Sequence, residues 1–310
     1  MSLEHQHCSS RAGAAAIVEN TDSLERNWPD RTASRYVSAG EFSWHVRIVG
    51  TGPVLLLVHG TGSSSHSWNH LVPDLARNFT VVAPDLPGQG LSRNAPGAAH
   101  SLPGMSSELA KLLKKLGLEP ALAVGHSAGA AILISMCCDG AIAPRSVVSL
   151  NGALRPFGGV GGQVFAPLAK VLVLNPLVPR FLSWRARDRG TVERLLKETG
   201  SALSADDVDC YVRLFKDQGH VAATLGMMAR WDLFPLQAAM KKLQTPVVLV
   251  AADGDKTVSP SAAVIVQRIV PNARVQRLAG VGHLAHEERP ELVLKLIADV
   301  ARETGLSKLH

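Results

Sequence analysis

The chain has 310 residues, of which 46% are hydrophobic and 19% are charged. This is an ordinary globular composition, with enough apolar side chains for the core of one large α/β domain or two small ones. The net charge of +6 is only mildly basic, and no nucleic-acid-binding motif accompanies it. The basic residues are dispersed along the chain except for one cluster, which comprises Arg180, Arg185, Arg187 and Arg189.

No stretch of the sequence resembles a targeting or membrane-spanning segment. The N-terminal residues lack a charged region followed by an apolar one, so we expect no signal peptide. No apolar run approaches the ~20 residues of a membrane span. Residues 164–178 are the most apolar, but Lys170, Asn175 and nearby prolines favour a lid or an interfacial segment. Cysteine spacing fits neither disulfides nor a zinc site, which favours reduced thiols in a cytoplasmic protein, at Cys8, Cys137, Cys138 and Cys210.

Apolar runs typical of buried strands alternate with helical patterns along most of the chain. Residues 1–27 precede them as a loose leader, in which the "HQHC" of 5–8 lacks further metal ligands. The alternating "FSWHVRIV" predicts a strand at 42–49. Buried strands are expected at 54–60, 79–85, 121–127, 146–152, 245–255 and 273–280. Helices are expected at 66–77, 103–116, 128–138, 259–270 and 289–303.

The regular alternation stops between residues 153 and 240. This segment contains "FGGVGG", several prolines and amphipathic helical stretches at 191–200 and 206–217. Strands that alternate with helices predict a mostly parallel central sheet with helices on both faces. We therefore predict an α/β core from residues 28–152 and 241–310, with residues 153–240 inserted as a helical lid. Because ligands bind beyond the carboxyl ends of such strands, the following loops are the candidate site.

The junction between the strand at 121 and the helix at 128 reads "AVGHSAGAA", with Ser127 between two glycines. A Gly-x-Ser-x-Gly match alone is weak evidence in a chain with 27 glycines. Here it stands between a predicted strand and a predicted helix, which is the context that a nucleophile elbow requires. Gly125 and Gly129 would let the strand and the helix approach closely. Ser127 is therefore the candidate nucleophile.

Two later loops carry the groups that would activate such a serine. The loop after the strand at 245 contains Asp253 and Asp255, and the loop after the strand at 273 contains His283 and His286. A serine hydroxyl needs a histidine base, and that histidine needs a carboxylate to fix its tautomer. The chain order serine, aspartate, histidine fits this arrangement. Either aspartate and either histidine remains a candidate from position alone.

The loop after the strand at 54 supplies the oxyanion hole that acyl chemistry needs. It reads "HGTG", and the backbone N–H of Thr61 would face the site together with that of Ala128. Gly62 is a weaker candidate. The "DLPGQGLS" of 85–92 is most simply a turn. No cofactor or metal is needed by this set of residues.

Together these motifs resemble the α/β-hydrolase superfamily from about residue 28 to the end of the chain. The resemblance implies the α/β-hydrolase fold. In its acid loop the catalytic aspartate precedes a valine and a proline, which selects Asp255. In its histidine loop the catalytic histidine follows a glycine and precedes Glu-x-Pro, which selects His283. The implied catalytic triad is thus Ser127, Asp255 and His283.

Less generic stretches are similar to the accessory proteins of magnesium chelatase in bacteriochlorophyll biosynthesis. They are "NWPDRTASRYVSAGEFSWHV" at 27–46, "GHSAGAAI" at 125–132, "MMARWDL" at 227–233 and "GVGHLAHEE" at 280–288. This resemblance implies a role beside magnesium insertion into a porphyrin, transient contact with magnesium chelatase and a place at the photosynthetic membrane. A non-catalytic factor that binds a porphyrin or assists assembly is the alternative to a serine hydrolase.

The lid should select the substrate. Its apolar side chains predict a pocket for a small hydrophobic, porphyrin-like molecule. Arg155 and the Arg180–Arg189 cluster would then meet carboxylates such as porphyrin propionates. The residues expected to line the pocket are His59, His126, Phe157, Met227, Met228 and Trp231.

Overall fold

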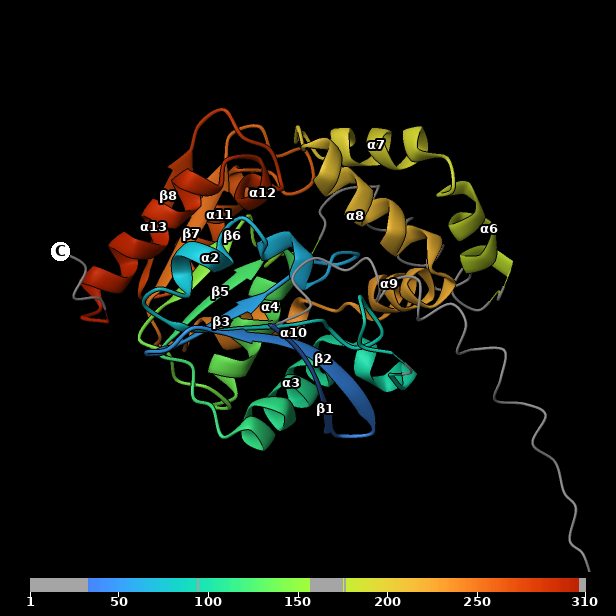
Figure 1. The fold of residues 1–310 in the computed structure, drawn as a ribbon. Coiled ribbons are helices and arrows are strands. Elements are labelled where there is room, and N and C mark those ends of the chain that lie inside the picture. Colours follow the sequence, from blue (N-terminus) through green and yellow to red (C-terminus); the bar gives the residue numbers. More distant parts are fainter. Residues whose placement is uncertain (1–32, 94, 157–174, 176, 307–310) are drawn as a thin grey trace, which may run out of the picture.

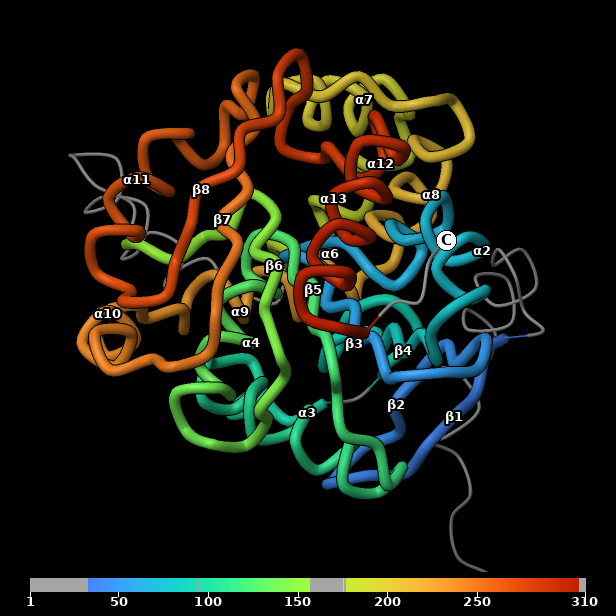
Figure 2. The backbone as a smooth tube through the Cα atoms, turned by 90° about the vertical axis from the view of Figure 1, so that its left-hand side faces the viewer, coloured from blue at the N-terminus to red at the C-terminus, as the bar shows by residue number. Residues whose placement is uncertain are grey.

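The computed structural model describes residues 33–93, 95–156, 175 and 177–306. Within these residues one eight-stranded sheet has the order β1-β2-β4-β3-β5-β6-β7-β8, which Figure 2 shows from right to left. Only the pairs β1–β2 and β2–β4 are antiparallel. The strands are Ser34–Ala39 (β1), Phe42–Val49 (β2), Val54–Val58 (β3), Thr80–Pro84 (β4), Leu122–His126 (β5), Val147–Leu150 (β6), Val247–Ala252 (β7) and Ala273–Leu278 (β8).

Helices cover both faces of this sheet, so its central strands are buried on both sides. Along β3, Leu55 and Leu57 enter one apolar core, while Leu56 and Val58 enter the other. Because neighbouring residues of a strand point to opposite faces, such a strand is apolar without interruption. The expected mostly parallel sheet between two helical layers is confirmed.

Each layer of helices contributes its apolar face to one of the two cores. One layer consists of Leu102–Leu116 (α3), Ala128–Cys138 (α4), Phe234–Met240 (α10) and Ser261–Gln267 (α11). The other contains Val72–Leu75 (α2) and Pro290–Glu303 (α13), to which Ala285–Glu288 (α12) leads.

The edge strand β1 and the first helix of the core differ from the sequence expectation. Strand β1 was not expected; it pairs with β2 along the edge of the sheet. The helix expected at 66–77 was wrong, because the chain forms a 3-10 helix at Ser65–Trp68 and then the separate α2. Pro73 lies in the first turn of α2, where its missing N–H is tolerated, but it cannot continue a helix from residue 66.

Further helices lie between β6 and β7 and form a unit that we call the cap, composed of α6 to α9. In Figure 1 they lie beside the carboxyl ends of the central strands. Their own apolar cluster includes Val192, Val208 and Tyr211. Helix α10 also precedes β7 but packs Leu236 and Met240 against the sheet core. The cap helices are Leu177–Arg185 (α6), Arg189–Glu198 (α7), Ala205–Lys216 (α8) and Gln218–Arg230 (α9).

Two stretches discussed above lie outside the described residues. They are most of the apolar segment at 164–178, namely 164–174 and 176, and the "HQHC" of 5–8. Among the described helices, none combines the length and the apolar character that a membrane crossing demands.

Candidate active site

Ser127 lies in a sharp turn between β5 and α4. Its backbone has φ 52° and ψ −115°, a positive φ that a side-chain-bearing residue rarely adopts. The Ser127 N–H donates to the Leu150 carbonyl at 2.9 Å, so the neighbouring strand holds the turn. A Cβ at Gly125 would meet the backbone of Ala130, and one at Gly129 would collide with the carbonyl of Val58. The two glycines therefore permit the close approach of strand and helix.

Asp255 and His283 lie together at the ends of β7 and β8. The His283 Nδ1 and the Asp255 Oδ2 are 2.8 Å apart, and both residues are buried. The other carboxylate oxygen of Asp255 accepts hydrogen bonds from the N–H groups of Thr257 (2.7 Å) and Val258 (2.8 Å). With Nδ1 engaged, Nε2 is the His283 nitrogen available for proton transfer.

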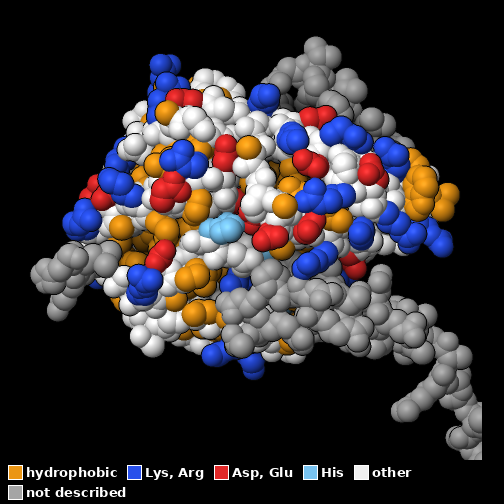
Figure 3. Space-filling model, turned by 45° about the horizontal axis from the view of Figure 1, so that its top comes forward, with side chains coloured by type: hydrophobic (Ala, Val, Ile, Leu, Met, Phe, Trp, Pro, Cys, Tyr) orange, Lys and Arg blue, Asp and Glu red, His pale blue; other side chains and the backbone are white. Residues whose placement is uncertain are grey.

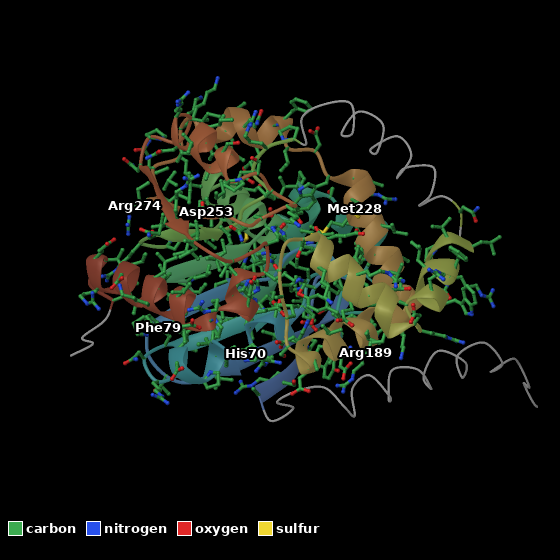
Figure 4. The ribbon with its side chains drawn as sticks, turned by 90° about the horizontal axis from the view of Figure 1, so that it is seen from above. His70, Phe79, Arg189, Met228, Asp253 and Arg274 are labelled. Carbon is green, nitrogen blue, oxygen red and sulfur yellow. The ribbon has the colours of Figure 1, made fainter. Side chains whose placement is uncertain are left out.

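The alternative aspartate and histidine lie elsewhere. Asp253 is exposed and lies 3.5 Å from the Arg277 guanidinium (Figure 4). The His286 ring packs against the rings of Trp68 and His126, at centroid distances of 4.6 and 4.5 Å. Neither of its nitrogens has a hydrogen-bond partner among the described residues. Burial lowers the pKa of His286 to about 3, so this ring is neutral at physiological pH.

The backbone of His283 is held by two side chains that sequence reasoning did not assign to this task. The His283 carbonyl accepts hydrogen bonds from His126 Nε2 at 3.0 Å and Asn151 Nδ2 at 2.9 Å. Asn151 Nδ2 also donates to the Gly282 carbonyl at 3.2 Å, while its Oδ1 accepts from the Ala252 N–H at 2.9 Å. Asn151 thus joins the ends of β6 and β7 to the histidine loop.

The signal for Asn151 in the sequence was an Asn-Gly pair directly after a buried strand. The residue has φ 45°, a conformation that asparagine tolerates better than most residues. His126, expected on the pocket wall, is buried. Burial, followed by the neighbouring His286 and His283, lowers its pKa well below the usual histidine value. It is therefore a neutral donor to the His283 carbonyl.

The loop after β3 carries the expected oxyanion-hole residue. The Gly62 N–H donates to Gln89 Oε1 at 2.8 Å, so it is already used. This leaves the N–H groups of Thr61 and Ala128 as the candidate pair. His59, expected on the pocket wall, is buried behind this loop. Its Nδ1 donates to the Gly60 carbonyl at 2.8 Å and its Nε2 accepts from the Leu86 N–H at 2.9 Å, so no ring nitrogen is left for a substrate.

The cap reaches the same loop through α9. The Thr61 hydroxyl donates to the Met227 sulfur at 3.4 Å, and Gln89 Nε2 donates to the same sulfur at 3.3 Å. His220 Nε2 donates to the Gly62 carbonyl at 3.2 Å, while its Nδ1 accepts from the Gly90 N–H at 3.0 Å. Burial lowers the pKa of His220 to about 4, which keeps this ring neutral. Helix α9 thus contacts the candidate oxyanion loop directly.

The other expected pocket residues are distributed differently. Met228, next to Met227, is 54% exposed (Figure 4). Trp231 is partly buried against the apolar core, with its indole N–H buried and without a partner among the described residues. Phe157 lies outside the described residues. Of the expected pocket residues in α9, Met227 is thus the one brought to Thr61.

Besides contacting the Thr61 loop, the cap makes buried polar contacts with the loop that carries His283. The Tyr211 hydroxyl donates to Glu287 Oε1 at 2.7 Å and lies 3.2 Å from the Ser63 hydroxyl. Burial raises the pKa of Glu287 well above its usual value, while the hydrogen bond from Tyr211 acts in the opposite direction. The Leu284 N–H also donates to the Ser201 hydroxyl at 2.8 Å. The cap therefore contacts both sides of the candidate site.

The arginine cluster does not line this site. Arg180 and Arg187 line an open pocket between α6 and the α8–α9 junction, and none of Ser127, Asp255 and His283 is among its lining residues. Across the described residues, no group of three or more His, Cys, Asp or Glu side chains is placed to hold a metal ion.

Residues 55–296 match the model of the alpha/beta hydrolase family. The chain belongs to the α/β-hydrolase family.

Two relatives and one solved structure illustrate the range of this α/β-hydrolase family. The chain is 37% identical over 278 residues to the magnesium-chelatase 30 kDa subunit of Rhodobacter capsulatus, covering 89% of this chain and 97% of the relative. It is 29% identical over 280 residues to the 2-(acetamidomethylene)succinate hydrolase of Mesorhizobium japonicum, covering 87% and 95% of the two chains. The Bacillus megaterium epoxide hydrolase superposes with a TM-score of 0.70 at 22% identity, covering 86% of this α/β hydrolase and 100% of that chain. That last likeness concerns the fold.

Proposed function

We propose that this chain is a serine hydrolase that cleaves a carboxylic ester or a related acyl bond. The observation that carries the proposal is the buried His283–Asp255 pair, 2.8 Å apart, at the same edge of the sheet as the strained elbow of Ser127. A serine on such a turn needs a base, and a histidine oriented by a carboxylate is the usual one.

In the proposed reaction, the Ser127 Oγ attacks the acyl carbon as its proton passes to His283 Nε2. The carbonyl electrons move onto the oxygen, which the N–H groups of Thr61 and Ala128 stabilise. When the carbonyl re-forms, the leaving group departs with the proton from His283. Water then attacks the acyl-enzyme, gives a proton to His283, and Ser127 leaves with that proton restored. Asp255 stays ionised and stabilises the imidazolium throughout.

The nucleophile is tested with a fluorophosphonate probe and a chromogenic ester. We expect the wild-type chain to be labelled, and Ser127→Ala to lose labelling and about 10⁴-fold or more of kcat. Ser149→Ala is a matched control, because Ser149 is also buried in the neighbouring strand β6 but is not part of the proposed machinery. Undiminished turnover in Ser127→Ala would overturn the proposal. Asp255→Asn is expected to lower kcat by about 10⁴-fold by fixing the wrong tautomer.

A second candidate function is a binding or assembly factor for magnesium chelatase. It is favoured by the 37% identity over almost the whole chain to a relative named as a magnesium-chelatase subunit. A porphyrin-like ligand and transient contact with the chelatase belong to this candidate. The cap then covers the bound molecule, with Met227 beside the Thr61 loop.

The two candidate functions are distinguished by measuring probe labelling of Ser127 alongside porphyrin binding and association with the chelatase. Protoporphyrin binding is measured by quenching of protein fluorescence, and association by co-purification with the chelatase subunits. If Ser127→Ala retains both but loses probe labelling, catalysis and binding are separate properties. Absence of both in the wild-type chain would exclude the second candidate.

A further inference from the structure

Helix α6 turns its large apolar side chains away from the protein. Leu177, Phe181 and Trp184 are 64%, 57% and 58% exposed. Their spacing of four and three residues places them on one stripe of the helix. The buried residues of α6 are Pro179 and Ser183. A surface helix normally buries its large apolar residues, so α6 is amphipathic in the reverse sense.

Cationic side chains surround this stripe. Arg180, Arg185 and Arg187 are exposed, and none of them makes an ion pair with a described carboxylate. On the next helix, by contrast, Arg189 pairs with Asp209 at 2.8 Å and with Glu193 at 3.3 Å. Arg180 and Arg185 of α6 and Arg187 just after it therefore have no charge partner among the described residues, whereas Arg189 has two.

Apolar and cationic groups together line an open pocket of about 530 Å³. Figure 3 shows orange side chains at the right-hand edge of the molecule, bordered by blue ones. The Phe181 and Trp184 rings lie 5.9 Å apart. We call this surface the α6 face; it comprises Leu177, Arg180, Phe181, Trp184, Arg187 and Lys216.

We propose that the α6 face docks on a phospholipid bilayer that contains anionic lipids. Tryptophan and phenylalanine are stable at the depth of the lipid headgroups, where an apolar ring meets a polar layer. Guanidinium groups form charge-assisted hydrogen bonds with phosphates. The absence of an acidic side chain between Leu177 and Arg187 matches a negative surface.

The charge of the α6 face argues against a second copy of the chain as its occupant. A two-fold symmetric interface brings each patch against its own copy. Arg180 and Arg187 would then face the same cations of the other copy, and like charges that meet across an interface are costly. Apolar contact alone would have to offset that repulsion.

The position of α6 connects the α6 face to the candidate active site. Helix α6 packs on α9, and α9 carries His220 and Met227 to the loop of Thr61. The pocket also includes Lys216 and Gln218, where α8 passes into α9. Docking would therefore bring the cap, rather than the opposite side of the sheet, next to the bilayer. The inference does not depend on the chemistry proposed for Ser127.

The experiment is co-sedimentation of the full chain with vesicles of phosphatidylcholine alone or mixed with phosphatidylglycerol. We expect binding to the mixed vesicles, weakening as salt is added. Phe181→Ser with Trp184→Ser removes the apolar contact, and Arg180→Glu with Arg187→Glu reverses two charges. Each pair is expected to weaken binding by about tenfold or more.

Two matched controls lie outside the α6 face. Phe234→Ser changes a side chain of α10 that is 70% exposed, and Arg268→Glu reverses an exposed charge after α11; both should bind as the wild-type chain does. Thermal unfolding verifies that each variant is folded. The salt dependence of binding is measured on the wild-type chain, so it tests the proposal even if a variant fails to fold. The proposal would be overturned if the chain bound neither vesicle or bound both equally. It would also be overturned if both variant pairs bound as the wild-type chain does, or if the chain formed a dimer that the variants dissociate.

Discussion

The two ends of the candidate active site are held by different parts of the molecule. At the base end, the side-chain partner of His283 is Asp255 in the loop after β7, and its carbonyl donors are His126 at the end of β5 and Asn151 just after β6. At the oxyanion end, the loop of Thr61 and Gly62 is contacted by Met227 and His220 of the cap. The side chains that hold His283 therefore come from the strand ends, although the cap also reaches its loop at Thr199 and Ser201, whereas two cap side chains contact the oxyanion loop.

This difference predicts that changes in the two regions affect different properties. Buried strand ends are among the most rigid parts of a fold, since they open only with the whole core. Surface helices with their own small core open at lower cost. Variants at the base end should therefore lower both kcat and stability, while variants at the cap end should lower activity with a smaller loss of stability.

The sheet end is tested by Asn151→Gly, for which we expect the largest effect among the residues that hold the two ends of the site in place. Glycine keeps the positive φ but removes hydrogen bonds to Gly282, His283 and Ala252. We expect a loss of about 3 kcal/mol in the free energy of unfolding, at about 1 kcal/mol for each bond. A displaced His283 is also expected to lower kcat about 100-fold at similar KM.

Steady-state ester hydrolysis and urea unfolding measure these two effects. Asn272→Gly serves as the control, because Asn272 is exposed and donates only to the Gln244 carbonyl. An unchanged kcat in Asn151→Gly would mean that the sheet does not position the base through this side chain.

The cap end is tested by His220→Phe. The phenylalanine fills a similar volume but loses the hydrogen bonds with Gly62 and Gly90. We expect kcat/KM to fall about tenfold as the oxyanion loop loosens, with about 2 kcal/mol of stability lost. His70→Phe is the matched control, since His70 also links core and cap, through Asp207 at 2.8 Å, but does not touch this loop. Equal activity losses in the two variants would contradict a specific role for His220.

The smallest expected effect is on the pH dependence of stability. Burial lowers the pKa of His286 to about 3, whereas a histidine of the unfolded chain titrates near 6.5. Between these values the unfolded chain binds the extra proton, so stability falls as the pH falls below about 6.5. The loss approaches about 1.4 kcal/mol per pH unit for one ring.

His286→Phe should remove this one contribution. The free energy of unfolding, measured in urea from neutral to mildly acidic pH, should then decrease less steeply than in the wild-type chain. Because burial raises the pKa of Glu287, this carboxyl lowers the stability as the pH rises above its unfolded pKa, but it is present in both proteins and cancels in the difference. An identical pH slope would mean that His286 is not held neutral.

Much of the fold could be predicted because its signals are local. The strand Val54–Val58 is apolar throughout since both faces are buried, and the Gly125 and Gly129 spacing marks the elbow. Ser127 and Asp255 end their predicted strands and His283 follows one, so sheet topology brings them to one edge.

The remaining parts depend on contacts through space. Asn151 and His220 reach loops far away in the sequence, and no spacing rule identifies their partners. Met227 and Met228 are adjacent, yet one is buried at the site and the other is half exposed. Which of them faces inward depends on the rotation of α9 about its axis, which is set by packing.

The insertion of the cap between β6 and β7 has a consequence for how such proteins diversify. Val147 lies opposite Val247 in a continuous parallel ladder, so the sheet closes as if the intervening segment were absent. Because lengthening a loop adds little entropic cost, segments of very different size are tolerated at this junction. The length of the segment inserted at this junction can therefore change while the pairing of β6 with β7 stays as it is.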